Sequence, residues 1–235
     1  MRGLIVMAMF VASLAHAAWK DYSEVRDLEL DAAGIGLLEM DTGAGSMDVK
    51  GAEGLDRIVV KATIVVSDTD DDDAAKLLDK KMKLSLDSRG DRAKLVADFD
   101  SGVFGSPDAR IDLQVSIPSG MAVHIDDGSG SISVMDTLAA IVIDDGSGSI
   151  DVRNVAGVEI DDGSGSIDIE MASGDVSITD GSGSIAVRSV SGSVTIDDGS
   201  GGIDVSDVEH DLIIVDDGSG SLSFTDVRGR VDHDS

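Results

Sequence analysis

Residues 125–134 read Ile-Asp-Asp-Gly-Ser-Gly-Ser-Ile-Ser-Val, and variants of this stretch recur through the second half of the chain. The first glycines of the six copies are Gly128, Gly146, Gly163, Gly181, Gly199 and Gly218, so successive copies are 18, 17, 18, 18 and 19 residues apart. A unit this short holds too few apolar residues to bury a core alone, so copies must stack on one another. The period therefore predicts a solenoid with one copy per turn.

Four apolar columns emerge when the copies are aligned, two before the turn and two after it. Val or Ile fills 22 of the 24 positions and alternates with polar residues in most copies, which excludes helix and predicts strands with an inner and an outer face. The columns before the turn are Val123, Ile141, Val158, Val176, Val194, Ile213 and Ile125, Ile143, Ile160, Ile178, Ile196, Val215. Those after it are Ile132, Ile150, Ile167, Ile185, Ile203, Leu222 and Val134, Val152, Ile169, Val187, Val205, Phe224.

A fifth, looser column lies about three residues after the second strand and gives each rung a short third side. Its members are Val155, Val190, Val208 and Val227, with Thr137 or Leu138 and Met171 or Ala172 in the other copies. A glycine often follows, which suits a second corner. Because stacked strands lie about 4.8 Å apart, six rungs predict an all-β fold, a parallel β-helix about 29 Å long.

The first half predicts the same fold in a less regular form. Residues 38–49 repeat the rung pattern, and residues 58–66 read as another strand. The acidic cluster at 68–73 and the residues up to Lys81 predict a short helix, and residues 82–86 and 93–99 predict a hairpin. We expect residues 18–118 to form an N-terminal cap with the first irregular rungs, and residues 119–235 to form the regular repeats.

The first 17 residues have the pattern of a signal peptide. Arg2 precedes an uncharged apolar run, and Ala15-His16-Ala17 suits a signal peptidase, which would leave Ala18 as the first mature residue. The run is shorter than the roughly 20 residues that a membrane-spanning helix needs. We therefore expect an exported protein without a membrane span, located in the periplasm, on the outer cell surface or outside the cell.

The charge of the chain limits its partners. The formal charge is 18 − 46 = −28, and loss of Arg2 with the leader leaves −29 over 235 − 17 = 218 residues. Such a field repels nucleic acid and anionic lipid and attracts cations. The chain has no cysteine, so neither a disulfide framework nor a lipid-anchored terminal cysteine is available. We exclude nucleic acid as a partner and expect an unknown cell-surface or envelope ligand.

Residues 115–120, Val-Ser-Ile-Pro-Ser-Gly, lead into the first copy, and with the six copies they carry a family resemblance. They resemble the bacterial putative-adhesin family of β-strand-repeat proteins, a domain of unknown function related to the head domain of auto-transporter adhesins. The resemblance covers most of the mature chain, including the helix-plus-hairpin insertion. It implies an exported solenoid and no catalytic residues. The turns of this chain are richer in aspartate than the resemblance leads us to expect.

Two aspartate columns are the repeated chemistry. Asp126, Asp144, Asp161, Asp197 and Asp216 are expected to face solvent, and Asp127, Asp145, Asp162, Asp180, Asp198 and Asp217 to lie at the corner. Carboxylates about 4.8 Å apart repel by about 0.9 kcal/mol even in water. We expect the corner aspartates to accept hydrogen bonds from the N–H groups of Ser129, Gly130 and their equivalents. Alternatives are a row of calcium sites and a weak, diffuse association with Ca²⁺. The calcium-binding nonapeptide pattern disfavours ordered sites, because Ile132 stands where that pattern needs an aspartate.

Catalysis has less support. A β-helical carbohydrate-active enzyme, our alternative hypothesis, needs unlike acids and sugar-stacking aromatics, whereas this chain has uniform acids and one Trp, one Tyr and four Phe. The serines of Gly-Ser-Gly lack a nucleophile context, and no lysine follows to suit a phosphate loop. His124, His210 and His233 are scattered, and we expect them to be solvated. We nominate no catalytic, cofactor-binding or metal-ligating residue, and predict a non-enzymatic, adhesin-like binding or structural module.

Overall fold

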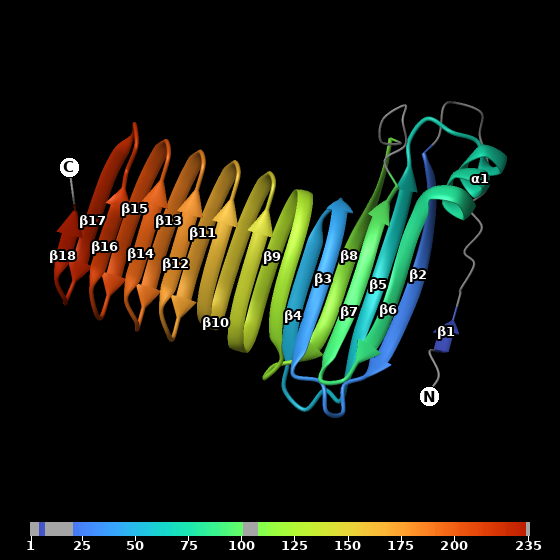
Figure 1. Ribbon diagram of the computed structural model, residues 1–235, viewed down its shortest axis with the longest axis horizontal. Coiled ribbons are helices and arrows are strands. Elements are labelled where there is room, and N and C mark those ends of the chain that lie inside the picture. Colours follow the sequence, from blue (N-terminus) through green and yellow to red (C-terminus); the bar gives the residue numbers. More distant parts are fainter. Residues whose placement is uncertain (1–4, 8–20, 101–107, 234–235) are drawn as a thin grey trace.

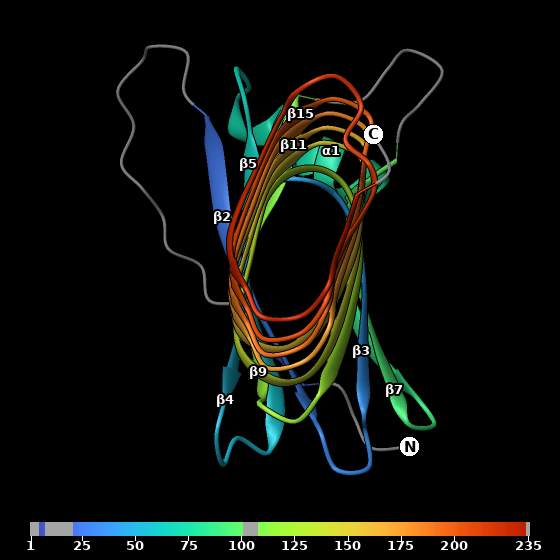
Figure 2. The ribbon, with the colours of Figure 1, turned by 90° about the vertical axis from the view of Figure 1, so that its left-hand side faces the viewer.

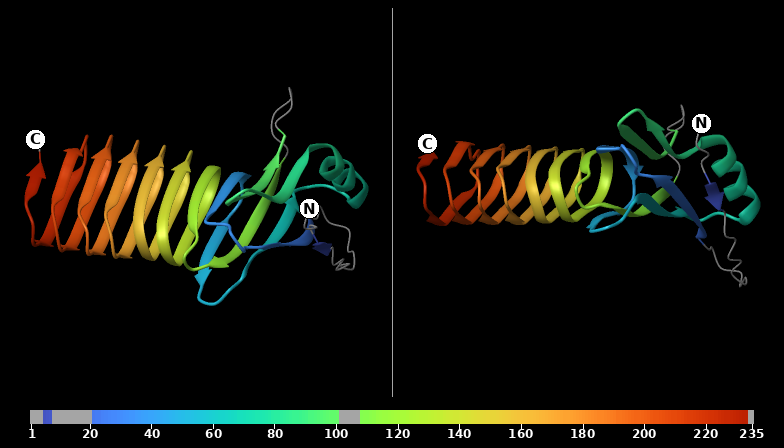
Figure 3. Two further views of the ribbon diagram at one scale, coloured as in Figure 1. Left: turned by 60° about the horizontal axis from the view of Figure 1, so that its bottom comes forward. Right: turned by 90° about the horizontal axis from the view of Figure 1, so that it is seen from below.

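The computed structural model describes residues 5–7, 21–100 and 108–233, and it is a β-solenoid with a mixed-sheet region at its N-terminal end (Figures 1 and 3). The rungs stack along the long axis, with the C-terminus at one end and helix α1 near the other (Figure 1). Seen end-on, the rungs superimpose as a flattened oval (Figure 2). The predicted fold class is confirmed. Most of the expected signal peptide lies outside the described residues; Ile5–Met7 forms strand β1, antiparallel to β2.

Each rung contributes one strand to each of two parallel faces. We call the face before the Asp-Asp-Gly corner the pre-turn face and the other the post-turn face. Strands β9 (Ala122–Asp145) and β10 (Gly148–Asp162) run through both faces. The pre-turn face continues with β12 (Val176–Asp180), β14 (Val194–Asp198), β16 (Leu212–Asp216) and β18 (Val231–His233). The post-turn face continues with β11 (Gly165–Ala172), β13 (Gly183–Val190), β15 (Gly201–Val208) and β17 (Ser221–Val227).

The predicted apolar columns form the core. Ile150 pairs in parallel register with Ile132 on one side and Ile167 on the other, and Ile167 pairs with Ile185. From Val123 to Val205, every column residue is at most 5% exposed. Identical side chains therefore stack on one another along the axis, and most of the burial comes from contacts between rungs.

The last rung departs from the predicted columns. Leu212 and Ile214 take the inward places expected for Ile213 and Val215, and Val215 is 52% exposed. The reason is a register shift: Ile196 pairs with Ile214, but Asp197 pairs with Asp216, so Val215 has no partner in the register. The last copy is one residue longer than the copy before it, and the shift accommodates that residue. Of the predicted core positions in this rung, Leu222 is only half-buried and Phe224 is 42% exposed, because the described residues place no rung over them.

The second corner is made by a residue with positive φ directly before the fifth column. These residues are Asp136, Asn154, Met171, Ser189, Asp207 and Asp226, with φ between 53° and 62°. The bend turns the next side chain inward, so Thr137 and Ala172 are buried, while Leu138 and Met171 are exposed. The open choice between these pairs is thereby settled. This bend was not predicted, because the corner had been assigned to the glycines that follow it.

The N-terminal region continues both faces with changed strand directions. Strands β3 (Leu37–Ala44) and β4 (Met47–Ala52) form a rung in parallel register with β9, as predicted for residues 38–49. Beyond them lie β7 (Arg92–Phe99), parallel to β3, and β8 (Ala109–Pro118), parallel to β4. Three further strands run antiparallel to their neighbours. Strand β6 (Met82–Arg89) pairs with β7, and β5 (Arg57–Val66) pairs with β8. Strand β2 (Tyr22–Asp31) pairs with β5.

The predicted helix and hairpin both lie in this region. Helix α1 spans Asp71–Lys81, with Asp70 as its N-cap, and buries Ala74 and Leu78. Strands β6 and β7 are the hairpin. Among the described residues, no helix has the length and apolar character needed to cross a membrane.

Candidate functional site

The corner turns place the inner aspartate column. In four successive copies the side-chain Oδ1 accepts a hydrogen bond from the backbone N–H of the serine two residues later: Ser147 to Asp145 (3.1 Å), Ser164 to Asp162 (3.1 Å), Ser182 to Asp180 (3.0 Å) and Ser200 to Asp198 (3.0 Å). The Asx-type turn is therefore confirmed for the serine donor. The expectation for the second glycine is wrong, because its N–H donates to the next rung, as Gly148 does to the Ser164 carbonyl oxygen (2.9 Å).

The same corner requires glycine because the backbones of neighbouring rungs approach closely. Gly165 has a φ of +157°, and a Cβ on it would lie 1.5 Å from the carbonyl oxygen of Gly148. The equivalent glycines of the rungs on either side, Gly148 and Gly183, are similarly constrained. The Gly-Ser-Gly sequence is thus a stacking device, and this explains its repetition without a phosphate or a nucleophile.

The inner aspartates are far more buried than a corner position suggests. Asp127, Asp145, Asp162, Asp180 and Asp198 are 0–6% exposed. The signal was present in the sequence: Asp127 follows Ile125 by two residues, so the period of two places both on the inner face. We call these five residues the aspartate column. They pair in register along the axis, as Asp162 does with Asp145 and Asp180.

Each carboxyl group of the aspartate column has one oxygen without a partner. The Oδ2 atoms of all five residues are buried and receive no hydrogen bond. Burial raises the pKa of Asp145 and of Asp180 to about 6, with a further increase from the charges of the neighbouring rungs, while the backbone N–H bonds lower it. Burial also raises the pKa of Asp127, Asp162 and Asp198. A proton on Oδ2 would reduce both the desolvation cost and the repulsion.

The aspartate column has a defined start and end. At the first rung Thr42 pairs with Asp127, and its hydroxyl donates to Asp127 Oδ1 (2.6 Å). At the last rung the register shift makes Asp216 the turn acceptor, with the Gly218 N–H at 2.8 Å. Asp217, which we expected at the corner in line with Asp198, does not join the column and is half-exposed. A neutral donor therefore begins the column, and the shift ends it at Asp198.

The outer aspartates lie on the solvent side of the pre-turn face. Asp126, Asp144, Asp161, Asp197 and Asp216 are exposed, as predicted. His124 is half-exposed and lies beside this row, with Nε2 2.8 Å from Asp144 Oδ2. His210 is exposed, and His233 Nε2 lies 3.5 Å from Asp217. The three histidines do not converge on one place in the fold.

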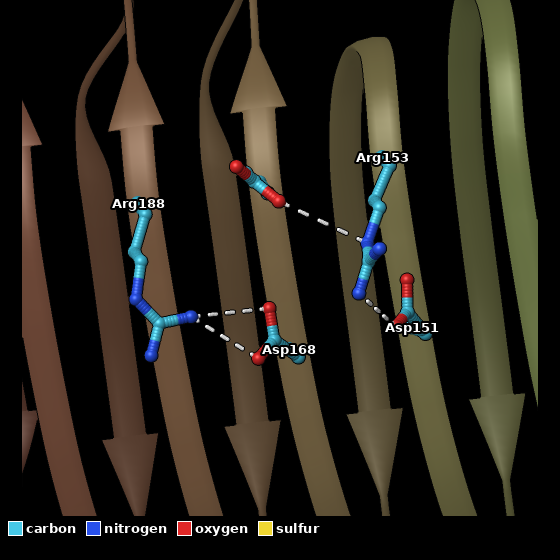
Figure 4. Close-up of polar contacts among 5 residues, drawn as sticks. Asp151, Arg153, Asp168 and Arg188 are labelled. Carbon is cyan, nitrogen blue, oxygen red and sulfur yellow. Dashed lines mark hydrogen bonds and ion pairs between the residues drawn. The ribbon is translucent and has the colours of Figure 1, made fainter.

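The post-turn face carries charges of both signs (Figure 4). Arg188 on β13 reaches across a rung to both carboxylate oxygens of Asp168 on β11, at 3.1 and 3.3 Å. Arg153 on β10 contacts Asp151 on its own strand (2.7 Å) and approaches Glu170 on the next rung (3.9 Å). The pairs are solvent-exposed, so each contributes about 0–1 kcal/mol to stability. The pair of Arg153 with Asp151 lies within one strand and could have been read from the sequence, whereas the contacts with Glu170 and Asp168 depend on the register between rungs.

Two hollows on the described surface lie near the N-terminal region. The larger, about 460 Å³, is lined by residues that include Ile35, Leu55, Pro118 and Met121. The smaller, about 160 Å³, is lined by Glu39, Met40, Asp41, Lys94, His124 and Asp126. Its charges are already paired, with Lys94 Nζ 2.9 Å from Asp41 Oδ2. Neither hollow has an aromatic residue among the described lining residues, and the described residues hold no group of three or more His, Cys, Asp or Glu arranged for a metal ion.

Comparisons with known proteins give weak structural likenesses. No family model matches the chain, and no curated protein matches it significantly. A putative cell adhesion protein from Clostridium sporogenes is similar at 13% identity and a TM-score of 0.42, over 87% of this chain and 99% of the other. A putative adhesin from Parabacteroides distasonis is similar at 11% identity and a TM-score of 0.36, over 91% and 94%. A putative adhesin from Parabacteroides merdae is similar at 14% identity and a TM-score of 0.26, over 88% of this chain and 95% of the other. At these scores the likenesses carry no functional argument.

Proposed function

We propose that this protein is an exported, non-enzymatic β-solenoid that presents its post-turn face to a cell-surface or envelope ligand, in the manner of an adhesin. The observation that carries the proposal is the row of exposed, mixed charges around Arg153 and Arg188 on one face of the solenoid. These arginines stand out in a chain with a formal charge of −28. A flat face of this kind suits binding to an extended ligand through repeated polar contacts.

The competing function is that of a β-helical carbohydrate-active enzyme. Such an enzyme needs two unlike carboxyl groups in a groove, one of them a proton donor, and usually aromatic residues that stack on sugars. The carboxyl groups with raised pKa are those of the aspartate column, which are buried away from any hollow lining. Of the acids of the smaller hollow, Asp126 is exposed, and Glu39 and Asp41 are half-exposed, with Asp41 already paired with Lys94. This separation favours binding over hydrolysis.

The proposal is tested with tagged mature protein, residues 18–235, and envelope fractions of the native cell. We expect saturable binding to these fractions, and recovery of the native protein outside the cytoplasm. The double variant Arg153→Glu/Arg188→Glu should weaken binding at least about tenfold, since it reverses two of the positive charges on the face. The matched control Lys76→Glu/Lys80→Glu makes the same charge change at exposed lysines of helix α1, away from the post-turn face, and should bind like the parent.

Three outcomes would contradict the proposal. One is the absence of saturable binding by the parent protein. Another is catalytic: release of new reducing ends or unsaturated products from envelope polysaccharides by the parent would favour the enzyme. If both double variants lose binding equally, the ligand is not recognised by the post-turn face.

A further inference from the structure

The two ends of the solenoid are finished differently. At the N-terminal end, antiparallel strands and α1 follow the parallel rungs. At the other end, β17 pairs with β15 and β18 with β16, and no described strand lies on their outer sides. The unpaired edge of β17 spans Ser221–Val227 and contains neither proline nor lysine, the residues that commonly protect such edges. We call β17, β18 and the residues between them the C-terminal edge.

Apolar side chains are exposed at this edge. Phe224 is 42% exposed and Val231 37% exposed, and Leu222 is half-buried. Leu222 and Phe224 continue the inner columns through Ile203 and Val205, so they are core residues that lack a covering rung. Covering them would bury apolar surface and satisfy the free backbone groups of β17 in the same step.

The charge of the edge differs from that of the chain. Residues 221–233 contain two arginines, Arg228 and Arg230, and two aspartates, Asp226 and Asp232, a formal balance of 2 − 2 = 0. Two chains of formal charge −28 repel one another over most of their surfaces. Close approach through this neutral edge avoids most of that repulsion.

From this geometry we infer that the C-terminal edge binds the same edge of a second copy, forming a closed two-fold dimer. A surface that covers this edge must present two strands at the distance that separates the two faces, with apolar residues between these strands. The same edge of a second copy, related by a two-fold axis, has these strands and apolar residues. The two-fold axis makes β17 antiparallel to β17 of the other copy. Pairing Leu222 with Phe224 in both directions keeps apolar residues on the inner side and places Ser223 opposite itself.

The mass of the mature protein in solution provides the first test. Sedimentation equilibrium should give twice the monomer mass at micromolar concentration. Phe224→Lys should return the mass to that of a monomer, because it places a charge between the two edges. Leu138→Lys is the matched control, since Leu138 is an exposed apolar residue at the second corner of the first repeat. It should leave the dimer intact, and circular dichroism should show that both variants remain folded.

Cross-linking provides the second test, which does not depend on disrupting the edge. The chain has no cysteine, so Ser223→Cys introduces a single thiol that mild oxidation should convert into a covalent dimer. Ser133→Cys is the control, because Ser133 occupies the same outward column near the start of the repeats and joins Ser223 through successive strand pairs. A monomeric parent, open-ended assemblies, or equal cross-linking of the two variants would overturn the inference.

Discussion

The stacked parallel rungs and the connections of the N-terminal region use glycine for different purposes. In the rungs, a Cβ on Gly148 or Gly165 would lie 1.5–1.6 Å from a carbonyl oxygen of the preceding rung, and Gly45 in the parallel rung of β3 and β4 is similarly close to Ile111. In the connection between β2 and β3, a Cβ on Gly36 would meet nothing within 4 Å. Parallel stacking in identical register brings backbones together at every corner, whereas antiparallel strands and α1 leave their connections open. A solenoid therefore restricts its corners as strictly as its core, and the following experiments test that contrast.

The largest effect is expected in the core of the rungs. Ile167→Asp buries a charge between Ile150 and Ile185, where no partner is available, at a cost of several kcal/mol against a typical total stability of about 5–15 kcal/mol. Much of the repeat region should unfold. Asp168→Ala, at the neighbouring exposed position, loses only the pair with Arg188 and should cost about 1 kcal/mol or less. Equal melting temperatures for the two variants would contradict the inward and outward assignment.

The second prediction concerns the corners directly. Gly165→Ala should destabilise the protein by about 2–4 kcal/mol, because the added methyl group clashes with the Gly148 backbone and its φ is unfavourable for alanine. Gly36→Ala should be neutral or slightly stabilising, since the space beside it is open and the unfolded chain loses freedom. Urea unfolding of both variants measures the difference. Similar losses would show that the contrast between the two regions is wrong.

A smaller effect is expected from pH. The pKa of Asp145 and of Asp180 is raised to about 6, above the ordinary value of 3.8, so the folded protein takes up these protons before the unfolded chain does. The resulting stabilisation is complete below about pH 4 and is lost as pH rises through about 6. Thermal unfolding should therefore show greater stability at pH 5 than at pH 7.5, with a contribution from the aspartate column on the order of 2 kcal/mol.

Variants assign this pH dependence to the aspartate column. Asp145→Asn/Asp180→Asn replaces two titrating groups with neutral amides and should reduce the difference between pH 5 and pH 7.5. Asp144→Asn/Asp197→Asn makes the same change at two exposed residues of the outer row and should leave most of the stability difference between pH 5 and pH 7.5. If the outer pair has the larger effect, general surface repulsion dominates instead.

The smallest effect is expected from calcium. Asp162→Asn retains the acceptor for the Ser164 N–H and removes a charge beside Asp145 and Asp180, so stability in low salt should hold or rise slightly. Melting in chelator and in millimolar calcium, at fixed ionic strength, should differ little for the parent. A large stabilisation by calcium that magnesium does not reproduce, and that Asp162→Asn partly loses, would establish ordered calcium sites.

The sequence was sufficient to predict most of the fold, because the relevant interactions recur at fixed spacing. The columns through Ile125 and Ile167, the hairpin and α1 all follow from local patterns. Val215 was misplaced because the added residue of the last copy changes the register, and only pairing with Ile196 and Asp197 reveals where. The positive φ of Met171 and Ser189 has no residue-type signal, whereas Asn154 is of a type that adopts this conformation more readily than most residues other than glycine.

The candidate site was only partly predictable. The turn bonds of Asp162 and its equivalents followed from residue type, and the period of two could have indicated their burial. The contacts of Arg153 with Glu170 and of Arg188 with Asp168 could not be predicted, because they depend on which side chains become neighbours across rungs. Interactions within one copy are readable from the sequence, whereas those between unlike copies require the register.

The identical register of Ile150, Ile167 and Ile185 also bears on how such a chain changes over generations. Each rung presents the same residues to the rung before it and to the rung after it. Duplication of a segment about 18 residues long therefore inserts a rung that makes the same contacts with its neighbours as the existing rungs do. Every added copy lengthens the rod by about 4.8 Å and leaves both ends as they were. The length of the solenoid can thus change in uniform steps without a change at either end.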